Sequence, residues 1–186
     1  MSDWDDAFVR NKCRALFLDR DGVINHDTGY VYRIADFIFV SGIFELVSAA
    51  KEAGYRVIIV TNQAGIGRGL YTEEDFHNLM DWVTRQFCEK GGRIDGVYYC
   101  PNHPVHGIGR FRVDCPNRKP QPGMIHQAAK DHNIDLSRSI LVGDKSTDIA
   151  AGHAAGISQC ILLSVGDKSD KESNIVRDPR DVIHLL

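Results

Sequence analysis

Short apolar runs alternate along this chain with longer segments in which apolar residues recur every three or four positions. The run ALFL at 15–18 is wholly apolar and passes directly into polar residues, which is typical of a buried parallel strand. Similar runs predict further strands at 56–60, 96–99, 140–142 and 160–163. The segments with helical spacing predict helices at 42–53, 72–91, 122–132 and 149–155. Thr72 and Asp75 have the spacing of a capping box at the start of the second of these helices.

Strands that alternate with helices indicate βαβ units with right-handed crossovers. We therefore expect an α/β fold, a doubly wound parallel sheet with helices on both faces. In such sheets ligands bind beyond the carboxyl ends of the strands. Three predicted strands end in polar residues, namely Asp19 and Asp21, Thr61 and Asn62, and Asp144. These side chains should converge on one site.

Two stretches match no regular element. The glycine-rich segment GIGRG at 65–69 fits neither the dinucleotide-binding nor the P-loop pattern, and it predicts a flexible turn. Residues 100–120 are rich in proline, histidine, glycine and cysteine, and they predict an irregular loop. A loop of that length usually carries function or is held by a metal ion.

Composition narrows the class of protein. With 186 residues, 43% hydrophobic and 25% charged, we expect one globular domain over 1–186. The net charge of −3 provides no general attraction for nucleic acid, and no apolar run is long enough to cross a bilayer. We expect a cytoplasmic monomer without nucleic-acid or membrane partners. The five cysteines are scattered, which favours free thiols or a metal site over a disulfide framework.

The aspartates at the strand ends could hold a metal ion. Asp19 and Asp21 lie two positions apart, and Gly22 allows a sharp turn that brings both carboxylates to one site. With Asp144 as a third oxygen ligand, the set suits Mg²⁺. The alternative is that each aspartate only caps a turn or a helix. Lys119 and Lys145 could neutralise phosphoryl oxygens nearby, or they could be solvated surface lysines.

Four motifs occur in an order that resembles the haloacid dehalogenase superfamily of aspartate-nucleophile phosphatases. They are DRDGVIN at 19–25, TNQ at 61–63, RKP at 118–120 and GDK at 143–145 together with Asp148. Within that superfamily, DTGYV at 27–31, TNQAGIGRG at 61–69 and YYCP at 98–101 are similar to the heptose bisphosphate phosphatases, over about residues 14–165. The histidinol-phosphate phosphatases are the nearest alternative.

The resemblance implies a Mg²⁺-dependent phosphatase that removes the 7-phosphate of a heptose 1,7-bisphosphate. It makes Asp19 the nucleophile that forms an aspartyl-phosphate, and Asp21 the general acid and base. Mg²⁺ would be held by the Asp19 carboxylate, the Asp21 main-chain carbonyl and Asp144. Thr61 and Lys119 would donate to the transferring phosphoryl group. The implied substrate-binding residues are Asp27, Thr28, Gly29, Tyr30, Asn62, Gln63, Ala64, Arg118, Lys119 and Lys145. No insert between the motifs is long enough to form a separate cap domain.

Related phosphatases often carry a structural zinc in the loop after the third strand, and this sequence departs from that pattern. Cys100 and Cys115 stand at matching positions, but asparagines replace the other two ligands. His103 and His106 could complete a zinc site with the two cysteines. The alternative, a zinc-free loop with two thiols, is favoured because asparagine is a poor zinc ligand.

Two further interpretations concern the substrate and the class of protein. Arg110, Arg112 and Arg118 make the loop basic, as a second, non-reacting phosphate on the substrate would require, although a solvated loop would look the same. A receiver-like signalling module that only accepts a phosphoryl group is the rival from another class. Asp21 argues against it, because such a module has no acid/base aspartate two residues after its acceptor.

Overall fold

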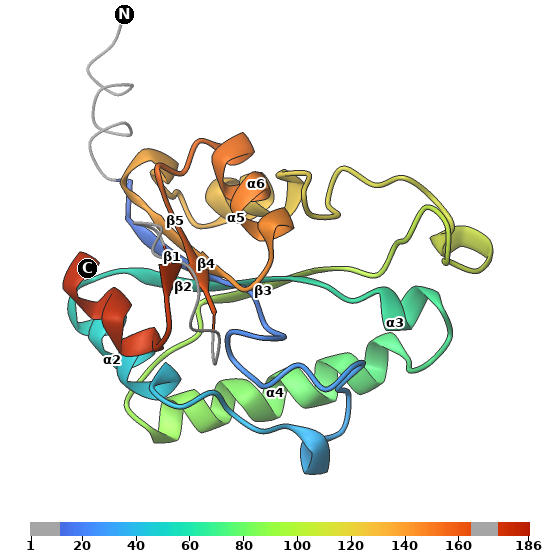
Figure 1. Cartoon of the computed structure of the whole chain (residues 1–186), viewed down its shortest axis with the longest axis horizontal. Helices are drawn as coiled ribbons and strands as arrows, with labels where there is room; N and C mark the ends of the chain where they lie inside the picture. Colours follow the sequence, from blue (N-terminus) through green and yellow to red (C-terminus); the bar gives the residue numbers. More distant parts are fainter. Residues whose placement is uncertain (1–11, 165–174) are drawn as a thin grey trace, which may run out of the picture.

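The computed structural model describes residues 12–164 and 175–186. Six strands within these ranges form one sheet (Figure 1). The order of the strands is β3-β2-β1-β4-β5-β6, and every pair of neighbours is parallel. The strands are β1 (Ala15–Leu18), β2 (Arg56–Asn62), β3 (Gly96–Cys100), β4 (Ile140–Gly143), β5 (Gln159–Leu163) and β6 (Ile175–Val176). The predicted doubly wound α/β fold is confirmed.

Helices cover both faces of the sheet (Figure 1). One face carries α2 (Ile43–Glu52) and α4 (Glu73–Glu89), and the other carries α5 (Gly123–Asp131) and α6 (Ser146–Ala155). The short helix α3 (Ala64–Gly67) follows directly after β2. Four 3₁₀ segments complete the described structure: η1 (Ile34–Asp36), η2 (Gly109–Phe111), η3 (Leu136–Arg138) and η4 (Pro179–Leu185). None of the helices in the described ranges is both long and apolar enough to span a bilayer.

The central strand β1 shows how the apolar runs build two cores. Side chains of a strand alternate between its faces. Leu16 and Leu18 therefore pack into the core under α2 and α4, and Ala15 and Phe17 pack into the core under α5 and α6. All four are fully buried. A strand buried on both sides needs a continuous apolar run, which is why its sequence does not alternate.

Helix α4 agrees with the sequence prediction in both its cap and its buried face. Thr72 Oγ1 accepts the Asp75 N–H at 3.0 Å, and the Asp75 carboxylate accepts the Thr72 N–H at 2.8 Å, so the predicted capping box is confirmed. Its predicted apolar stripe is buried against the sheet: Phe76, Leu79, Met80, Val83 and Phe87.

The structure differs from the sequence prediction in three places near the site. Strand β2 continues through Asn62 because β3 pairs with its last residues. Helix α6 begins at Ser146, three residues before the predicted start. The glycine-rich segment is a turn only at Arg68 and Gly69, because its first three residues belong to the packed helix α3. A side chain at Gly65 would lie 2.2 Å from the ring of Tyr71, so only glycine fits there.

Between β3 and α5 the only regular element in the described chain is η2, in agreement with the predicted irregular loop. That residues 1–186 form a single domain stays a prediction.

Candidate active site

The candidate site lies where the direction of winding reverses, at the carboxyl ends of β1 and β4, which are neighbours in the sheet. A cavity of about 220 Å³ opens there. Its lining includes these predicted residues: Asp19, Asp21, Asp27, Gly29, Tyr30, Thr61, Asn62, Gln63, Ala64, Lys119 and Lys145. It also includes Gly65, Tyr71, Thr147 and Asp148, which the sequence interpretation did not place in the site. The predicted residues Thr28 and Arg118 do not line this cavity, and Asp144 lines an adjoining hollow.

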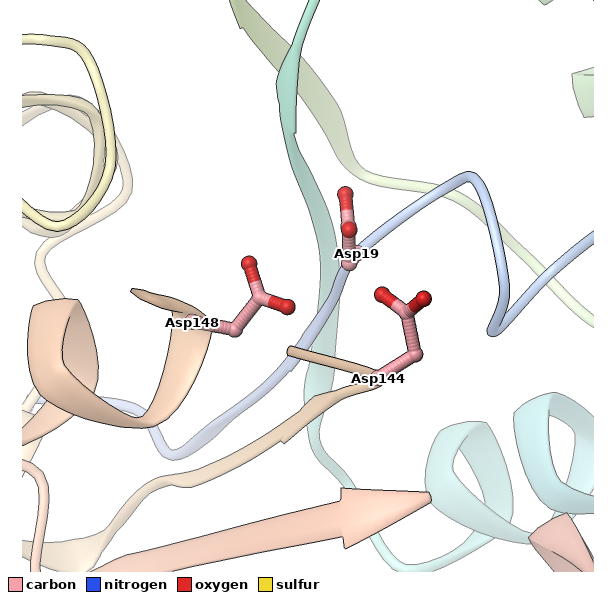
Figure 2. Close-up of side chains that lie close together, drawn as sticks. All are labelled: Asp19, Asp144 and Asp148. Atoms are coloured by element: carbon pink, nitrogen blue, oxygen red, sulfur yellow. The ribbon is translucent and has the colours of Figure 1, made fainter. Parts of the chain in front are cut away.

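Three carboxylates form a compact group at the floor of the site. Asp19 follows β1, Asp144 follows β4 and Asp148 belongs to the first turn of α6, and Figure 2 shows them around one small space. One oxygen of each lies within 4.8 Å of the others. Among the described residues, this is the only group of three potential metal ligands that lie within 4.8 Å of one another.

The crowding of the three carboxylates changes the pKa of Asp144. Burial, together with the nearby Asp19 and Asp148 carboxylates, raises the pKa of Asp144 to about 7. Its Oδ1 atom is buried and has no hydrogen-bond partner in the described structure. An orphaned carboxylate oxygen beside two more carboxylates is the donor set that a hard divalent cation such as Mg²⁺ prefers. The residues present therefore fit the metal that the sequence predicted, with Asp148 added to the group.

Gly22 allows Asp144 to reach this position. Its φ is +94°, and a Cβ atom there would lie 2.2 Å from Asp144 Oδ2. A glycine after the two aspartates is thus required twice, by the left-handed backbone and by the close approach of the β4 loop.

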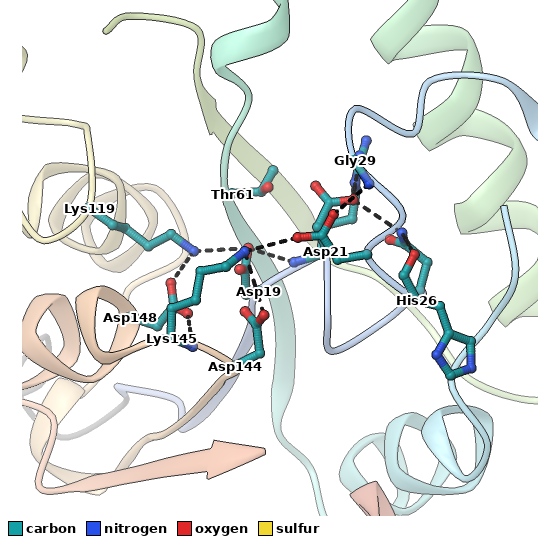
Figure 3. Close-up of polar contacts among 12 residues, drawn as sticks. Asp19, Asp21, His26, Gly29, Thr61, Lys119, Asp144, Lys145 and Asp148 are labelled. Atoms are coloured by element: carbon teal, nitrogen blue, oxygen red, sulfur yellow. Dashed lines mark hydrogen bonds and ion pairs between the residues drawn. The ribbon is translucent and has the colours of Figure 1, made fainter. Parts of the chain in front are cut away.

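Lys119 places a positive charge between two of the three carboxylates. It is 4% exposed, and its ammonium group lies 2.9 Å from Asp19 Oδ1 and 2.6 Å from Asp148 Oδ1 (Figure 3). It also donates to the Val60 carbonyl at 2.9 Å. Burial by itself lowers the pKa of Lys119, but the two carboxylates outweigh it and the net pKa is raised. The alternative of a solvated surface lysine is wrong for Lys119.

Lys145 is placed differently, at the mouth of the cavity. Its ammonium group contacts Asp27 at 3.1 Å and Asp144 at 3.5 Å, and its side chain is 53% exposed. Burial lowers its pKa, whereas Asp144 and Asp27 raise it, and the net pKa is raised. Because about half of the Lys145 side chain is exposed at the opening, its ammonium group can bind an incoming anion.

Asp21 is held from two directions. Its Oδ1 accepts from Arg20 Nη2 at 2.6 Å and Nε at 3.1 Å, and from Asn25 Nδ2 at 3.1 Å. Its Oδ2 accepts from Gln63 Nε2 at 3.0 Å. Arg20 is fully buried, so this ion pair is a fixed part of the site. Asp19 and Asp21 thus face one cavity with separate partners.

The RKP segment is held in place by hydrogen bonds to two asparagines. Asn62 Nδ2 donates to the Lys119 carbonyl and Asn62 Oδ1 accepts the Lys119 N–H, both at 3.1 Å. Arg118 Nη1 donates to the Asn102 carbonyl at 3.1 Å. Asn62 therefore positions a neighbouring loop. Its predicted contact with substrate is untested.

The four zinc candidates are not gathered into a ligand set. No three of Cys100, His103, His106 and Cys115 come within 4.8 Å of one another. The Nδ1 atom of His103 accepts the main-chain N–H groups of residues 105 and 106, at 3.1 Å each. Burial raises the pKa of Cys100 to about 11. For Cys115 burial acts in the same direction, but hydrogen bonds from Asn117 and Asn102 outweigh it and the pKa is lowered. A zinc site in this loop stays a prediction.

The arginines expected to bind a distal phosphate lie outside the cavity lining. Arg110 is exposed and pairs with Glu73 at 3.6 Å, and Arg112 is exposed. The distal phosphate site is untested.

The sequence interpretation quoted Asp148 with the GDK motif but gave it no role in the site. It lies four positions after Asp144, at the start of a helix. Tyr71 and Thr147 were not singled out from the sequence, and the structure places both in the cavity lining.

Comparison with known proteins agrees with this geometry. A family profile described as HAD-hydrolase-like matches residues 116–186. The chain is 56% identical over 178 residues to D-glycero-alpha-D-manno-heptose-1,7-bisphosphate 7-phosphatase of Burkholderia mallei, covering 94% of each chain. It is 45% identical over 177 residues to D-glycero-beta-D-manno-heptose-1,7-bisphosphate 7-phosphatase of Vibrio cholerae, covering 92% of this chain and 95% of that one.

Solved structures show the same likeness. A HAD-like phosphatase from Mesorhizobium loti has a TM-score of 0.84 at 36% identity, covering 93% of this chain and 85% of that one. The D,D-heptose 1,7-bisphosphate phosphatase from B. bronchiseptica, complexed with magnesium and phosphate, has a TM-score of 0.76 at 27% identity, covering 92% of this chain and 97% of that one.

Proposed function

This chain belongs to the heptose-1,7-bisphosphate 7-phosphatase family of the haloacid dehalogenase superfamily, and from this premise we propose that it is a Mg²⁺-dependent phosphatase that removes the 7-phosphate of D-glycero-D-manno-heptose 1,7-bisphosphate. The observation that carries the proposal is the pair Asp19 and Asp21, which line one cavity with separate partners, Asp19 being also a member of the three-carboxylate group.

In the proposed site, Mg²⁺ would be held by the Asp19 carboxylate, the Asp21 main-chain carbonyl and Asp144, with Asp148 close by. When bound, the metal screens the repulsion between an anionic nucleophile and an anionic phosphate. The orphaned Asp144 Oδ1 supports this assignment.

The reaction proceeds in two displacements. In the first, an Asp19 carboxylate oxygen forms a bond to phosphorus while the bond from phosphorus to the sugar oxygen breaks, and Asp21 gives a proton to that oxygen. In the second, water attacks the aspartyl-phosphate, Asp21 takes the proton from the water, and inorganic phosphate leaves. The same carboxyl group serves both steps because the first leaves it as the base that the second needs.

Thr61 and Lys119 would donate to the phosphoryl oxygens during both displacements. The Lys119 ammonium group already has three acceptors, so one of these contacts is exchanged when a phosphoryl oxygen binds. Asp27, Gly29, Tyr30 and Lys145 line the cavity with exposed side chains or backbone and would contact the sugar.

The test measures phosphate release from heptose 1,7-bisphosphate, as both anomers, and from histidinol phosphate, with Mg²⁺ and with EDTA. We expect faster release from the heptose bisphosphate, and no release with EDTA. Asp19→Asn should lower kcat by at least about 10⁴-fold while the fold survives. Faster release from histidinol phosphate would make that compound the assigned substrate in place of the heptose bisphosphate. Normal activity in Asp19→Asn would refute the mechanism. A persistent phosphoenzyme without turnover would favour a receiver-like module.

The monomeric state, the cytoplasmic location and the lack of nucleic-acid and membrane partners stay predictions, and no contact in the described structure bears on them.

A further inference from the structure

The side chain of Gln63 connects two groups that the proposed mechanism uses separately. It is 1% exposed, and its Nε2 atom donates both to Thr61 Oγ1 at 2.8 Å and to Asp21 Oδ2 at 3.0 Å. Its Oε1 atom accepts the Tyr71 hydroxyl at 2.5 Å. An amide has two N–H donors, so both are used within the protein and none is left for a substrate.

The two oxygens of Asp21 differ in what they can still do. Oδ1 accepts three N–H bonds from Arg20 and Asn25, which fills its capacity as an acceptor. Oδ2 accepts one, from Gln63, among the described residues. Oδ2 is therefore the atom with room to carry a transferable proton, and Gln63 is the group that sets its direction.

Tyr71 determines which way the Gln63 amide points. Burial raises the pKa of Tyr71 to about 12, so the phenol stays protonated and donates to Oε1. A flipped amide would turn Oε1 toward the Asp21 carboxylate, which is repulsive when Asp21 is ionised. The Tyr71 ring stacks on Tyr32 with centroids 5.1 Å apart and planes 7° apart.

The backbone is adapted to this contact. Tyr71 approaches α3 so closely that a Cβ atom on Gly65 would lie 2.2 Å from Tyr71 Cε1. Gly65 has no positive φ that would demand glycine, so the close approach of the Tyr71 ring is what excludes a side chain there.

We propose that Gln63 is a positioning residue that holds Asp21 Oδ2 for proton transfer to the leaving-group oxygen, with Tyr71 fixing the direction of the amide. This assignment replaces the predicted contact of Gln63 with substrate, and it rests on the proposed function. In the view of Figure 3, Asp21 and Thr61 lie on the same side of the site, with Lys119 across from them.

The experiment compares two leaving groups in the first turnover. Heptose 1,7-bisphosphate has a poor leaving group, a sugar oxygen that needs a proton from Asp21. The nitrophenolate of p-nitrophenyl phosphate is a good leaving group and departs almost without protonation. Stopped-flow release of the leaving group isolates this first displacement from the later hydrolysis. The variants are Gln63→Leu and Tyr71→Phe, and Tyr32→Phe is the matched control. Among the described residues, the side-chain hydrogen bonds of Gln63 go to Asp21, Thr61 and Tyr71 and not to Tyr32.

We expect Gln63→Leu to slow release from the sugar phosphate about 10²-fold, because general acid catalysis contributes that order of rate, and release from p-nitrophenyl phosphate less than about threefold. Tyr71→Phe should show the same asymmetry at about tenfold, KM should change little, and Tyr32→Phe should behave as wild type. If Gln63→Leu fails to fold, Tyr71→Phe carries the test, since it removes a single oxygen.

Equal losses with both esters would overturn the proposal, because they would mean that Gln63 acts through phosphate binding or packing. A change in KM alone would return Gln63 to the substrate-binding residues and would also overturn it. A wild-type protein that hydrolyses neither ester would instead refute the proposed function, so the two failures are distinguishable.

Discussion

At the scale of single residues, the main feature of the site is an excess of negative charge among buried side chains. Asp19 and Asp148 are at most 5% exposed, and Asp144 lies beside them. Lys119 offsets part of this charge from within, which explains why a lysine is almost fully buried here. The rest of the charge is what makes the group suited to a divalent cation.

Replacing Lys119 leaves two buried carboxylates without their partner. We expect Lys119→Met to lower the free energy of unfolding by about 3–5 kcal/mol, measured by urea denaturation in EDTA. Lys145→Met is the control, because its half-exposed ion pairs should contribute less than about 1 kcal/mol. Equal losses in the two variants would contradict the assignment of Lys119 as the internal counter-charge.

At the scale of elements, the site is made by loops that leave neighbouring strands. The loop after β1 carries Asp19, Asp21 and Gly22, and the loop after β4 carries Asp144. The two loops touch where Gly22 faces the Asp144 carboxylate. The position of one metal ligand therefore depends on the absence of a side chain in the other loop.

Gly22→Ala should displace Asp144 and weaken Mg²⁺ binding by about tenfold or more, which corresponds to about 1.4 kcal/mol. Calorimetric titration with Mg²⁺ measures this. Gly54→Ala is the matched control, since Gly54 has a φ of +81° with no atom within 4 Å of an added Cβ. It should cost about 1 kcal/mol of stability and leave Mg²⁺ binding unchanged. Unaltered Mg²⁺ affinity in Gly22→Ala would show that Asp144 is not a ligand.

At the scale of the whole molecule, the proposed metal site joins the two halves of the sheet. The chain winds from β1 through β2 to β3 on one side, then crosses to β4, β5 and β6 on the other. Asp19 comes from the first half, and Asp144 and Asp148 come from the second. A metal ion at this site would bind the folded chain and not the unfolded chain, because unfolding separates its ligands.

Mg²⁺ should therefore raise the melting temperature. At a concentration 100 times the dissociation constant the stabilisation is about 2.7 kcal/mol, which for a chain of this size is an increase of about 5–10 °C. Differential scanning fluorimetry with and without Mg²⁺ measures it, and Asp144→Asn should lose most of the increase. An equal increase in that variant would place the metal elsewhere.

Much of the fold and of the site was predictable because it is written in local patterns. The apolar runs of β1 to β5 and the stripe of α4 follow from which side chains must leave water, and the capping box follows from the spacing of two residues. Asp19, Asp21 and Thr61 were predictable because polar residues that end parallel strands meet at one edge of a sheet. Lys119 and Asp144 were predicted from their motifs as well.

The amino-acid sequence by itself thus determined the order of strands β1 to β5 and of helices α2, α4, α5 and α6, the class of fold and the groups at the ends of its strands, because these depend on periodicity and spacing along the chain. Only the tertiary structure decided that Tyr71 reaches Gln63, that Gln63 joins Asp21 to Thr61, and that Lys119 lies between two carboxylates. Most of those contacts join segments that are far apart in the sequence, and hydrogen bonds and ion pairs depend on distance and direction, which are set only when the strands lie side by side.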